Sequence, residues 1–412
     1  MNIAVMGYGT VGSGVVEIVD NKHADIQARH SKEDLKVTHI LDLRDFPGDP
    51  HEDILTKDFN DILSDDEVEI VVEAMGGVNP AFDFTAKCLA AGKHVVTSNK
   101  ELVATKGLEL LALAEEHNVN YLFEASVGGG IPILRPLSVC LAANGIESIN
   151  GILNGTTNFI LTKMIRENMT FEDVLKIAQA NGYAEADPTA DVEGIDACRK
   201  ISILASLGFG SYVNPKDIQT EGITHIMLED VAYANNADYV IKLIATAEKL
   251  ADGRINILVS PALVKKTSLL SSIDDVFNGI LVQGDCVGPA LFYGRGAGKL
   301  PTASACVADV IDCANHKDER RMIGWGPEQE GLVADAKTIP TKYYIRLQVE
   351  ESKVAQKEIR DAFGSIYLLA RSGAYSNELA FITTEMSEND IRGKLDSLTA
   401  AKLKSLIRVA NC

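Results

Sequence analysis

Asp196 and Lys200 are the first two residues whose types and spacing suggest chemistry. They lie four positions apart in a helical pattern, so their side chains share one face of the helix. The same face continues through Ile203 and Leu207, both apolar, so we expect it to run from a cleft into the core. A lysine held in such a place can act as a proton donor. The spacing is also compatible with an exposed ion pair that has no chemical role.

Two polar segments precede this helix and can supply further site residues. Residues 182–188, GYAEADP, follow a helical pattern that Gly182 is expected to end, which leaves Glu185 on a loop, where binding residues often lie. Residues 154–158, NGTTN, lie between two apolar runs. The second segment is compatible with a functional site and with a simple helix start that its asparagine caps.

A glycine-rich loop near the start of the sequence predicts a dinucleotide site. Gly7, Gly9 and Gly12 form the pattern G-x-G-x-x-G directly after an apolar run and at the start of a helical one. In that context the first glycine permits a tight turn, the second lets a pyrophosphate approach the backbone, and the third lets helix and strand pack closely. The alternative is a glycine-rich turn without a ligand.

The next apolar run ends at Asp42 and Arg44, where such sites distinguish the two nicotinamide cofactors. An acidic residue here binds the ribose 2′-hydroxyl of NAD, and an arginine suits the 2′-phosphate of NADP. Both residue types are present, so the choice between NADP and NAD stays open, with Arg44 favouring NADP. A solvated turn residue is the alternative interpretation of Arg44.

Short apolar runs alternate with helical patterns through the first third of the chain. The runs cover residues 3–6, 37–41, 70–73, 94–97 and 121–123. This alternation predicts a parallel, doubly wound sheet, and we expect an α/β fold with an N-terminal Rossmann NAD(P)-binding domain over residues 1–130. A helix over 301–316 is expected to return to this domain and complete it.

The pattern changes near residue 131. Longer helical patterns with some β-rich stretches predict an α+β substrate-binding domain over 131–300, including a helix over 132–142. Residues 317–341 are polar and contain several glycines and prolines, as in a linker. The tail, 342–412, has the order strand–helix–strand–strand–helix–strand, which predicts a small independent βαββαβ domain.

The composition is that of a globular protein and argues against several classes of partner. The 412 residues carry a formal net charge of −19, so nucleic acid and anionic membranes would repel the chain. No stretch of about 18 apolar residues occurs, so no membrane span is expected. The 7 cysteines are dispersed without a C-x-x-C pair, which predicts reduced thiols in a cytoplasm, and the 8 histidines lack metal-ligand spacing.

Six blocks of sequence follow one another between residues 1 and 313. They are GYGTVGSGVV, HVVTSNKELVA, EASVGGGIPI, GILNGTTNFIL, GYAEADPTADVEGIDACRK and FYGRGAGKLPTAS. In this order they resemble the homoserine dehydrogenases. The resemblance implies an NAD(P)-dependent enzyme that interconverts L-aspartate 4-semialdehyde and L-homoserine in threonine, methionine and isoleucine biosynthesis. Because the first block begins at residue 7, close to the start of the sequence, no aspartokinase domain is expected in front of it.

The resemblance implies a role for each matching position. Lys200 resembles the catalytic proton donor of the family, and Lys100 a lysine near both nicotinamide and substrate. Glu185 and Asp196 resemble the residues that bind homoserine, largely through its amino group. From motif and resemblance together, the residues expected at the cofactor are Gly7, Gly9, Thr10, Val11, Gly12, Arg44, Lys100, Gly182, Glu185 and Gly298.

The resemblance also implies a cation and an assembly. Glu124, Val127, Gly129 and Ile131 match a sodium site beside a dimerisation domain, so a homodimer or homotetramer is expected. A carboxylate with a glycine-rich turn can offer oxygens to a hard cation, and a packed loop without metal is the alternative. The tail resembles an ACT domain, but its first loop, residues 350–353, lacks the proline and glycine common there, so threonine feedback is not expected.

Two other functions are compatible with parts of the sequence. An aspartate-semialdehyde dehydrogenase needs a nucleophilic cysteine with a histidine base, and neither Cys140 nor Cys198 has an evident histidine partner. A nucleotide-sensing regulator without turnover would combine a Rossmann and an ACT-like domain. Such a regulator would not need two lysines together with Glu185 and Asp196, which argues against it.

Overall fold

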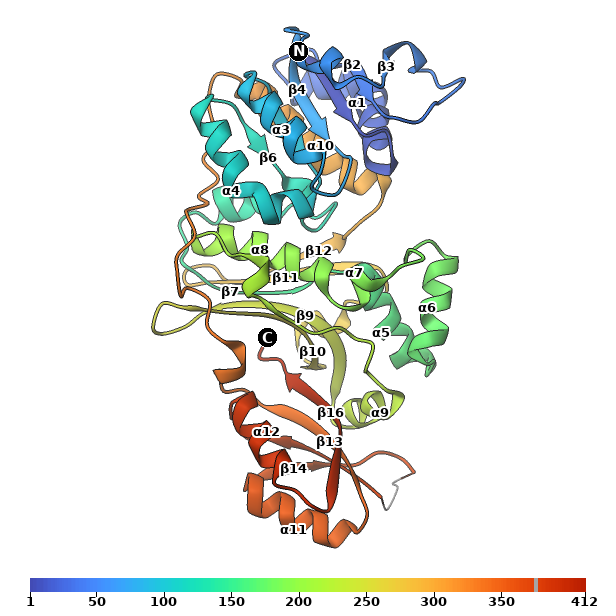
Figure 1. Ribbon diagram of the computed structural model, residues 1–412, viewed down its shortest axis with the longest axis vertical. Coiled ribbons are helices and arrows are strands. Elements are labelled where there is room, and N and C mark those ends of the chain that lie inside the picture. Colours follow the sequence, from blue (N-terminus) through green and yellow to red (C-terminus); the bar gives the residue numbers. More distant parts are fainter. Residues whose placement is uncertain (374–376) are drawn as a thin grey trace. The chain divides into compact units, whose positions relative to one another are not determined.

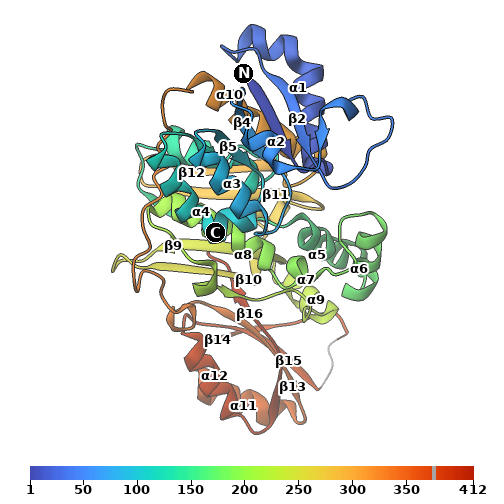
Figure 2. The same ribbon diagram turned by 45° about the horizontal axis from the view of Figure 1, so that its top comes forward.

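The computed structural model describes residues 1–373 and 377–412, and this part of the chain divides into two compact units. Unit 1 comprises residues 1–144, 202–215 and 292–329. Unit 2 comprises residues 145–201, 216–291 and 330–412. Each unit therefore combines segments that are distant in the sequence, as the colours of the ribbon show (Figures 1 and 2).

Unit 1 is built on a parallel sheet with the strand order β3-β2-β1-β4-β5-β6, the order of a dinucleotide-binding Rossmann fold. The predicted fold class is confirmed here, because each apolar run of the first third forms a strand. The strands are β1 (Asn2–Met6), β2 (Lys36–Leu41), β3 (Leu55–Thr56), β4 (Val68–Glu73), β5 (His94–Thr97) and β6 (Tyr121–Leu122).

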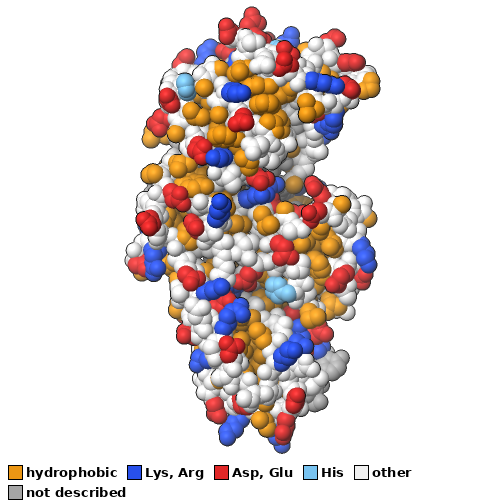
Figure 3. Space-filling view, viewed as in Figure 1, with side chains coloured by type: hydrophobic (Ala, Val, Ile, Leu, Met, Phe, Trp, Pro, Cys, Tyr) orange, Lys and Arg blue, Asp and Glu red, His pale blue; other side chains and the backbone are white. Residues whose placement is uncertain are grey.

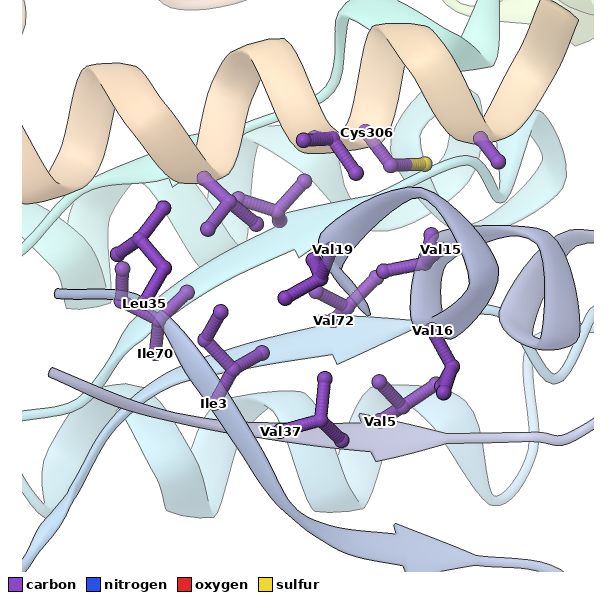
Figure 4. Close-up of a cluster of buried hydrophobic side chains, with 14 of the residues drawn as sticks. Ile3, Val5, Val15, Val16, Val19, Leu35, Val37, Ile70, Val72 and Cys306 are labelled. Atoms are coloured by element: carbon purple, nitrogen blue, oxygen red, sulfur yellow. The ribbon is translucent and has the colours of Figure 1, made fainter. Parts of the chain in front are cut away.

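Helices cover this sheet and bury its apolar side chains. Figure 4 shows the side chains of Val15, Val16 and Val19 from α1 packed with those of the neighbouring strands, with Cys306 of α10 beside them. A Cβ on Gly14 would lie 2.9 Å from the Cβ of Ala303, so α1 and α10 touch directly. The helices of unit 1 are α1 (Thr10–Arg29), α2 (Phe59–Leu63), α3 (Ala81–Ala90), α4 (Lys100–Glu116) and α10 (Lys299–Asn315).

Unit 2 is built on a mixed sheet with the order β12-β11-β7-β9-β10-β16-β13-β15-β14, and β8 pairs with β10 outside this path. The last residues of β12 belong to unit 1. The strands are β7 (Ile146–Ile152), β8 (Gln219–Thr220), β9 (Tyr239–Lys249), β10 (Ile255–Lys265), β11 (Phe277–Gly284), β12 (Gly288–Arg295), β13 (Tyr343–Val349), β14 (Ile366–Leu369), β15 (Glu378–Thr383) and β16 (Ala401–Val409).

The helices of unit 2 include a group formed by α5, α6, α7 and α9, which lie together in both ribbon views (Figures 1 and 2). The first residues of α8 belong to this unit and its later residues to unit 1. The helices are α5 (Gly155–Glu167), α6 (Phe171–Ala180), α7 (Thr189–Val192), α8 (Ile195–Phe209), α9 (Leu228–Asn236), α11 (Ser352–Phe363) and α12 (Glu388–Asp396).

The tail has the predicted order of elements, β13-α11-β14-β15-α12-β16. Its sheet is continuous with that of the preceding domain, because β16 pairs in parallel with β10 at Ala262–Arg408 and Leu263–Val409. The tail has its own apolar core between α11, α12 and its strands. We therefore describe it as a βαββαβ extension of the unit 2 sheet.

Two local predictions were wrong or incomplete. The helix expected over 132–142 is a short π-helix, Pro136–Cys140, in which the Leu141 N–H donates to the Pro136 carbonyl. A proline has no N–H to continue a regular helix through this position. The long strand β9 was not predicted from the sequence; it pairs along its whole length with β10.

Candidate active site

The glycine-rich loop joins β1 to α1, as predicted, and its glycines meet different surroundings. A Cβ on Gly12 would lie 1.8 Å from the Gly7 carbonyl oxygen, so the helix and the loop are in close contact. At Gly9 the nearest described atom to such a Cβ is the Arg44 guanidinium, at 3.9 Å. Gly9 is also the N-cap of α1, whose first backbone N–H groups can bind a phosphate. The loop therefore offers an open approach to its backbone at Gly9.

Asp42 and Arg44 lie against this loop and are fixed by each other. The Tyr8 N–H donates to Asp42 Oδ2 at 2.8 Å, and Arg44 donates to the two carboxylate oxygens at 2.9 and 2.8 Å. These bonds from Arg44 hold the pKa of Asp42 well below its usual range. The Arg44 guanidinium also lies over the Phe46 ring, 5.1 Å from its centre. An arginine and a carboxylate are thus held together at the position where this fold binds the 2′-hydroxyl or 2′-phosphate of the adenosine ribose.

Lys100 is the first residue of α4, and the loops around it are fixed by buried hydrogen bonds. The Thr97 hydroxyl donates to Glu73 at the end of β4, at 2.6 Å. Asn99 caps α4 and donates from its side-chain amide to the Gly77 carbonyl, also at 2.6 Å. The carboxyl ends of β4 and β5 are therefore tied together, at the sheet edge where ligands bind in doubly wound folds. Lys100 itself is half-buried.

In unit 2, Asp196 and Lys200 form a buried pair on α8. The two residues are 4% and 7% exposed, and Lys200 Nζ donates to Asp196 Oδ2 at 2.6 Å. The same ammonium donates to the Leu153 carbonyl oxygen at 2.8 Å. Further along this face, Ile203 and Leu207 are buried, as expected. The pair is therefore not an exposed surface ion pair, which was the alternative interpretation of the spacing.

Asn154 joins this pair to a second carboxylate that sequence reasoning missed. Its side-chain amide donates to Asp196 Oδ2 at 2.8 Å and to Asp191 Oδ1 at 2.7 Å. Asp191 lies on α7, a four-residue helix just before α8. The sequence signal for Asp191 was its short distance from Asp196, five residues along the chain. The two residues lie on consecutive helices, α7 and α8, so their carboxylates can lie close together. Two carboxylates, an amide and an ammonium thus form one cluster.

The loop that carries Gly182 and Glu185 is attached to the start of α5. The Thr156 hydroxyl donates to the Tyr183 carbonyl oxygen at 2.6 Å, and the Gln179 side chain donates to the Glu185 carbonyl at 3.1 Å. Gly182 ends α6 with a φ of +72°, as predicted for a helix end. Glu185 is exposed on this loop, near the helix start that Asn154 caps.

The residues expected to hold sodium lie in unit 1. There the Glu124 carboxylate accepts hydrogen bonds from three backbone N–H groups. Glu124 Oε1 accepts from the N–H groups of Ile133 and Leu134 at 2.6 and 2.9 Å, and Oε2 accepts from that of Arg135 at 2.7 Å. Gly129 has a φ of +53°, and a Cβ there would lie 2.5 Å from the Gly296 carbonyl. The three bonds to Glu124 use most of the acceptor capacity of its carboxylate, so the backbone carbonyls of this turn are the main further oxygens available to a cation.

An aspartate-semialdehyde dehydrogenase would need a nucleophilic cysteine, and the buried Cys198 is unsuited to that role. Burial raises the pKa of the Cys198 thiol, whereas a nucleophilic cysteine needs a lowered pKa. Cys140 is exposed on the short π-helix of unit 1. In the part of the chain that the structure describes, no three His, Cys, Asp or Glu side chains gather as a metal-binding group.

Charge on the surface is mixed. On the face shown in Figure 3, acidic and basic side chains are interspersed over both units. The sequence carries 58 acidic against 39 basic residues, which disfavours polyanionic partners. Across residues 1–373 and 377–412, no helix has both the length and the apolar character needed to cross a membrane.

The predicted site residues fall into two groups. Unit 1 holds the glycine loop with Thr10 and Val11, Arg44, Lys100 and Gly298, the residue that precedes α10. Unit 2 holds Glu185, Asp196 and Lys200. Unit 1 thus holds a loop suited to a dinucleotide, and unit 2 holds a lysine and carboxylates suited to proton transfer and to binding a cationic substrate.

Comparison with known proteins identifies the family. Residues 7–124 match the family model of the homoserine dehydrogenase NAD-binding domain, and residues 132–311 match that of homoserine dehydrogenase. A homoserine dehydrogenase from Synechocystis is 39% identical and covers 99% of this chain, with 99% of its own length matched. The chain belongs to the homoserine dehydrogenase family.

Solved structures of homoserine dehydrogenases share the fold of this chain. That of a homoserine dehydrogenase from Thiobacillus denitrificans has a TM-score of 0.90 and 35% identity, covering 100% of this chain and 98% of its own. A hyperthermophilic archaeal homoserine dehydrogenase in complex with NADPH has a TM-score of 0.64 and 28% identity, covering 76% of this chain and 96% of its own. Family membership makes the chain an oxidoreductase with an NAD-binding domain.

Proposed function

We propose that the chain catalyses the reversible reduction of L-aspartate 4-semialdehyde to L-homoserine, with Lys200 as the proton donor. The observation that carries this proposal is the buried Asp196–Lys200 pair, in a family member that also has an ordered dinucleotide loop. An ammonium at 7% exposure interacts with charge in its surroundings more strongly than one in water.

Lys200 has the chemistry that the aldehyde oxygen requires. When bound, the nicotinamide cofactor supplies a hydride to the semialdehyde carbon. Negative charge then develops on the aldehyde oxygen, and the Lys200 ammonium stabilises that charge and transfers a proton to it. In the reverse direction Lys200 accepts the proton from the homoserine hydroxyl. Lys100 is proposed as the second catalytic lysine, near nicotinamide and substrate.

The substrate ammonium is proposed to bind to Glu185 and Asp196. Asp191 adds a third carboxylate, because Asn154 holds it beside Asp196. Anionic side chains in a partly buried cluster attract a cationic amino group and exclude a neutral one. A substrate that lacks the α-amino group should therefore be a poor one.

The cofactor is proposed to be NADP or NAD, bound along Gly7–Gly12 and at the nicotinamide end by Lys100, Gly182, Glu185 and Gly298. The open backbone at Gly9 fits a pyrophosphate. Arg44 favours NADP, since a guanidinium binds a phosphate well, but Asp42 already occupies it with two hydrogen bonds. These two bonds use two of the five guanidinium N–H groups, so Arg44 keeps donors for a 2′-phosphate while it stays bound to Asp42.

A sodium ion is proposed at Glu124, Val127, Gly129 and Ile131. Because three N–H groups already use most of the Glu124 carboxylate, the ligands would be mainly backbone carbonyl oxygens. A neutral set of carbonyl oxygens fits a monovalent hard cation. The residues present are therefore compatible with sodium in a structural role.

The remaining expectations are proposed on the sequence and its resemblance. They are a homodimer or homotetramer, a location in the cytoplasm, and an ACT-like tail that does not respond to threonine. Strong inhibition of the full chain by millimolar threonine would contradict the last of these.

The test of the proposed function is steady-state oxidation of L-homoserine by the purified chain, with NAD and with NADP. We expect reduced nicotinamide to form with L-homoserine and at least one of the two cofactors. A substrate analogue that lacks the α-amino group should give no formation of reduced nicotinamide. A chain that binds cofactor but forms no reduced nicotinamide from L-homoserine would contradict the proposal.

A further inference from the structure

Asn154 stands out because every hydrogen-bonding group of its buried side chain has a defined partner. The residue is 5% exposed, and its amide nitrogen donates to Asp191 and Asp196. Its Oδ1 accepts from the Thr157 N–H at 2.8 Å and from the Thr157 hydroxyl at 3.0 Å. A flipped amide would turn an oxygen toward two carboxylates and an NH₂ group toward an N–H. The orientation of the side chain is therefore fixed by its partners.

Capping of α5 does not by itself require an asparagine. Other helices of this chain are capped by Thr170 before α6, by Ser387 before α12 and by Asp58 before α2. Serine, threonine and aspartate are about as good in this role as asparagine. Only a side chain with both an acceptor and two donors can cap the helix and hold two carboxylates at once. Asparagine is the shortest residue that meets this requirement.

The amide also belongs to a closed ring with the lysine. Asp196 Oδ2 accepts from Asn154 and from Lys200, and Lys200 also donates to the carbonyl of Leu153, the residue before Asn154. A change in the Asn154 side chain therefore reaches Lys200 through Asp196. The amide is a neutral donor, so it holds the two carboxylates without neutralising their charge. Both carboxylates therefore keep the negative charge that attracts a substrate ammonium.

We propose that Asn154 is a positioning residue, whose amide holds Asp191 and Asp196 in the arrangement that binds the substrate ammonium and orients Lys200. This inference rests on the proposed function, in which Asp196 binds substrate and Lys200 transfers the proton. Asn154 need not touch the reacting atoms. Its effect on catalysis passes through the two carboxylates.

The test compares three substitutions in the full chain. Asn154→Ser keeps a capping group but is too short to reach the carboxylates, and Asn154→Ala removes both functions. Asn154→Asp keeps the size and the cap but turns the donor into a third carboxylate. Ser387→Ala, at the cap of α12, serves as the control for loss of a helix cap alone. For each variant, kcat and KM for L-homoserine, the cofactor Kd and the Tm are measured.

We expect Asn154→Ser to keep the Tm and the cofactor Kd while kcat/KM for L-homoserine falls about 10- to 100-fold, the worth of one or two hydrogen bonds to charged groups. Asn154→Ala should lose as much activity and also have a lower Tm. Asn154→Asp should lose more activity than either. The rise in Tm that L-homoserine causes with cofactor present should be smaller in Asn154→Ser than in wild type.

A purely structural role gives a different pattern. If Asn154 only caps α5, Asn154→Ser matches wild type in kcat/KM and in its homoserine-dependent Tm, and Asn154→Ala resembles Ser387→Ala. That result would overturn the inference while leaving the proposed function intact. A wild-type chain that does not oxidise L-homoserine would overturn both.

Discussion

The burial of Lys200 is the property of a single residue with the largest chemical consequence in this chain. Placing an ammonium at 7% exposure is costly unless it is paired, and Asp196 Oδ2 and the Leu153 carbonyl provide that compensation. The desolvation cost of burying this ion pair offsets most of its Coulombic gain, so the pair contributes little to the stability of the helix. Its presence is better explained by a reaction in which negative charge develops nearby.

Replacing Lys200 by methionine should remove the charge and keep the packing of the side-chain stem. We expect kcat for L-homoserine oxidation to fall by about two to four orders of magnitude, the usual worth of a general acid, while cofactor Kd stays within about threefold. The matched control is Lys163→Met, because Lys163 and Glu167 form an i,i+4 pair of the same type on α5. That pair is more exposed, and its loss should leave kcat unchanged.

If Lys200→Met has a kcat within a few-fold of Lys163→Met, another group donates the proton. Lys100 is then the next candidate, and Lys100→Met should show the large loss instead. Asp196→Ala should mainly raise KM for L-homoserine if the carboxylate binds the substrate in its ground state.

Gly9 gives a second prediction for a single residue. A Cβ at this position meets only the Arg44 side chain, at 3.9 Å, among the described atoms, so Gly9→Val should fold. Its side chain would nevertheless stand where a pyrophosphate approaches the backbone. We expect cofactor Kd to rise about tenfold or more with Tm almost unchanged. Unaltered cofactor affinity in the folded variant would remove this loop from the site.

At the scale of elements, sequence periodicity predicted the strands of unit 1 other than the two-residue β3, and most of the helices. The limit of this prediction is clear in β9, where Lys242, the fourth residue of the strand, is 1% exposed. Asn158, Asp274 and the Ile273 carbonyl accept its hydrogen bonds. A fully buried lysine breaks the apolar pattern, and the residues that compensate it are distant in the sequence, so the strand could not be recognised from local pattern.

The candidate site was predictable only where its residues are close in sequence. Asp196 and Lys200 share a helix face, so their contact follows from their spacing. The contacts of Asn154 with Asp191 and Asp196 span 37 and 42 residues, and no periodicity encodes them. From the sequence alone, the NGTTN segment is therefore compatible both with a helix cap and with a functional site. The structure gives its asparagine the hydrogen bonds of a cap and two further bonds to carboxylates.

The contact of α10 with the segment after β6 predicts a dependence of stability on pH. Asp309 of α10 is 2% exposed, accepts from the Glu124 N–H at 2.8 Å, and lies 2.6 Å from the Arg135 guanidinium. Burial raises the pKa of Asp309 to about 7, against an ordinary value near 4 in the unfolded chain. Between these two values the folded chain holds a proton that the unfolded chain releases. Stability from this group therefore falls as pH rises from about 4 to about 7, and is level above that.

Asp309→Asn isolates this effect, because an amide still accepts from Glu124 but does not titrate. Arg135 keeps Asp312 nearby, at 3.6 Å. We expect the Tm of Asp309→Asn minus that of wild type to increase as pH rises from about 5 to about 7, and to stay constant above about 7.5. A Tm difference that does not change over this range would show that Asp309 is ionised throughout.

On the scale of the whole molecule, the tail is joined to the rest of unit 2 by more than strand pairing. Asp230 of α9 is fully buried and accepts from the Tyr344 hydroxyl and from the Arg346 guanidinium of β13. Arg408 of β16 pairs with Glu221, next to β8. The buried carboxylate of Asp230 and the half-buried carboxylate of Glu221 are therefore compensated by arginines of the tail.

A chain truncated after Thr341 should therefore keep its chemistry and lose stability. The family models end at residue 311, and every predicted catalytic residue precedes that point. Removing one partner from a buried ion pair costs about 3–5 kcal/mol, and truncation leaves Asp230 without Arg346. We expect a markedly lower Tm, with kcat of the folded fraction within about threefold of wild type.

Two variants keep this prediction testable even if the truncated chain folds poorly. Asp230→Asn in the truncated chain removes the uncompensated charge and should raise its Tm. Arg346→Met in the full chain should lower Tm with kcat unchanged. A folded truncated chain with no activity would show instead that the tail is part of the catalytic unit.

The central claim is that this chain transfers a hydride between a nicotinamide cofactor and carbon 4 of a homoserine skeleton. The most direct measurement is mass spectrometry of the product formed from L-aspartate 4-semialdehyde with NADPH or NADH deuterated at the transferring carbon, with and without inorganic phosphate. We predict L-homoserine that carries one deuterium at carbon 4, formed at the same rate in both conditions. Absence of labelled homoserine, or its formation only when inorganic phosphate is present, would contradict the claim.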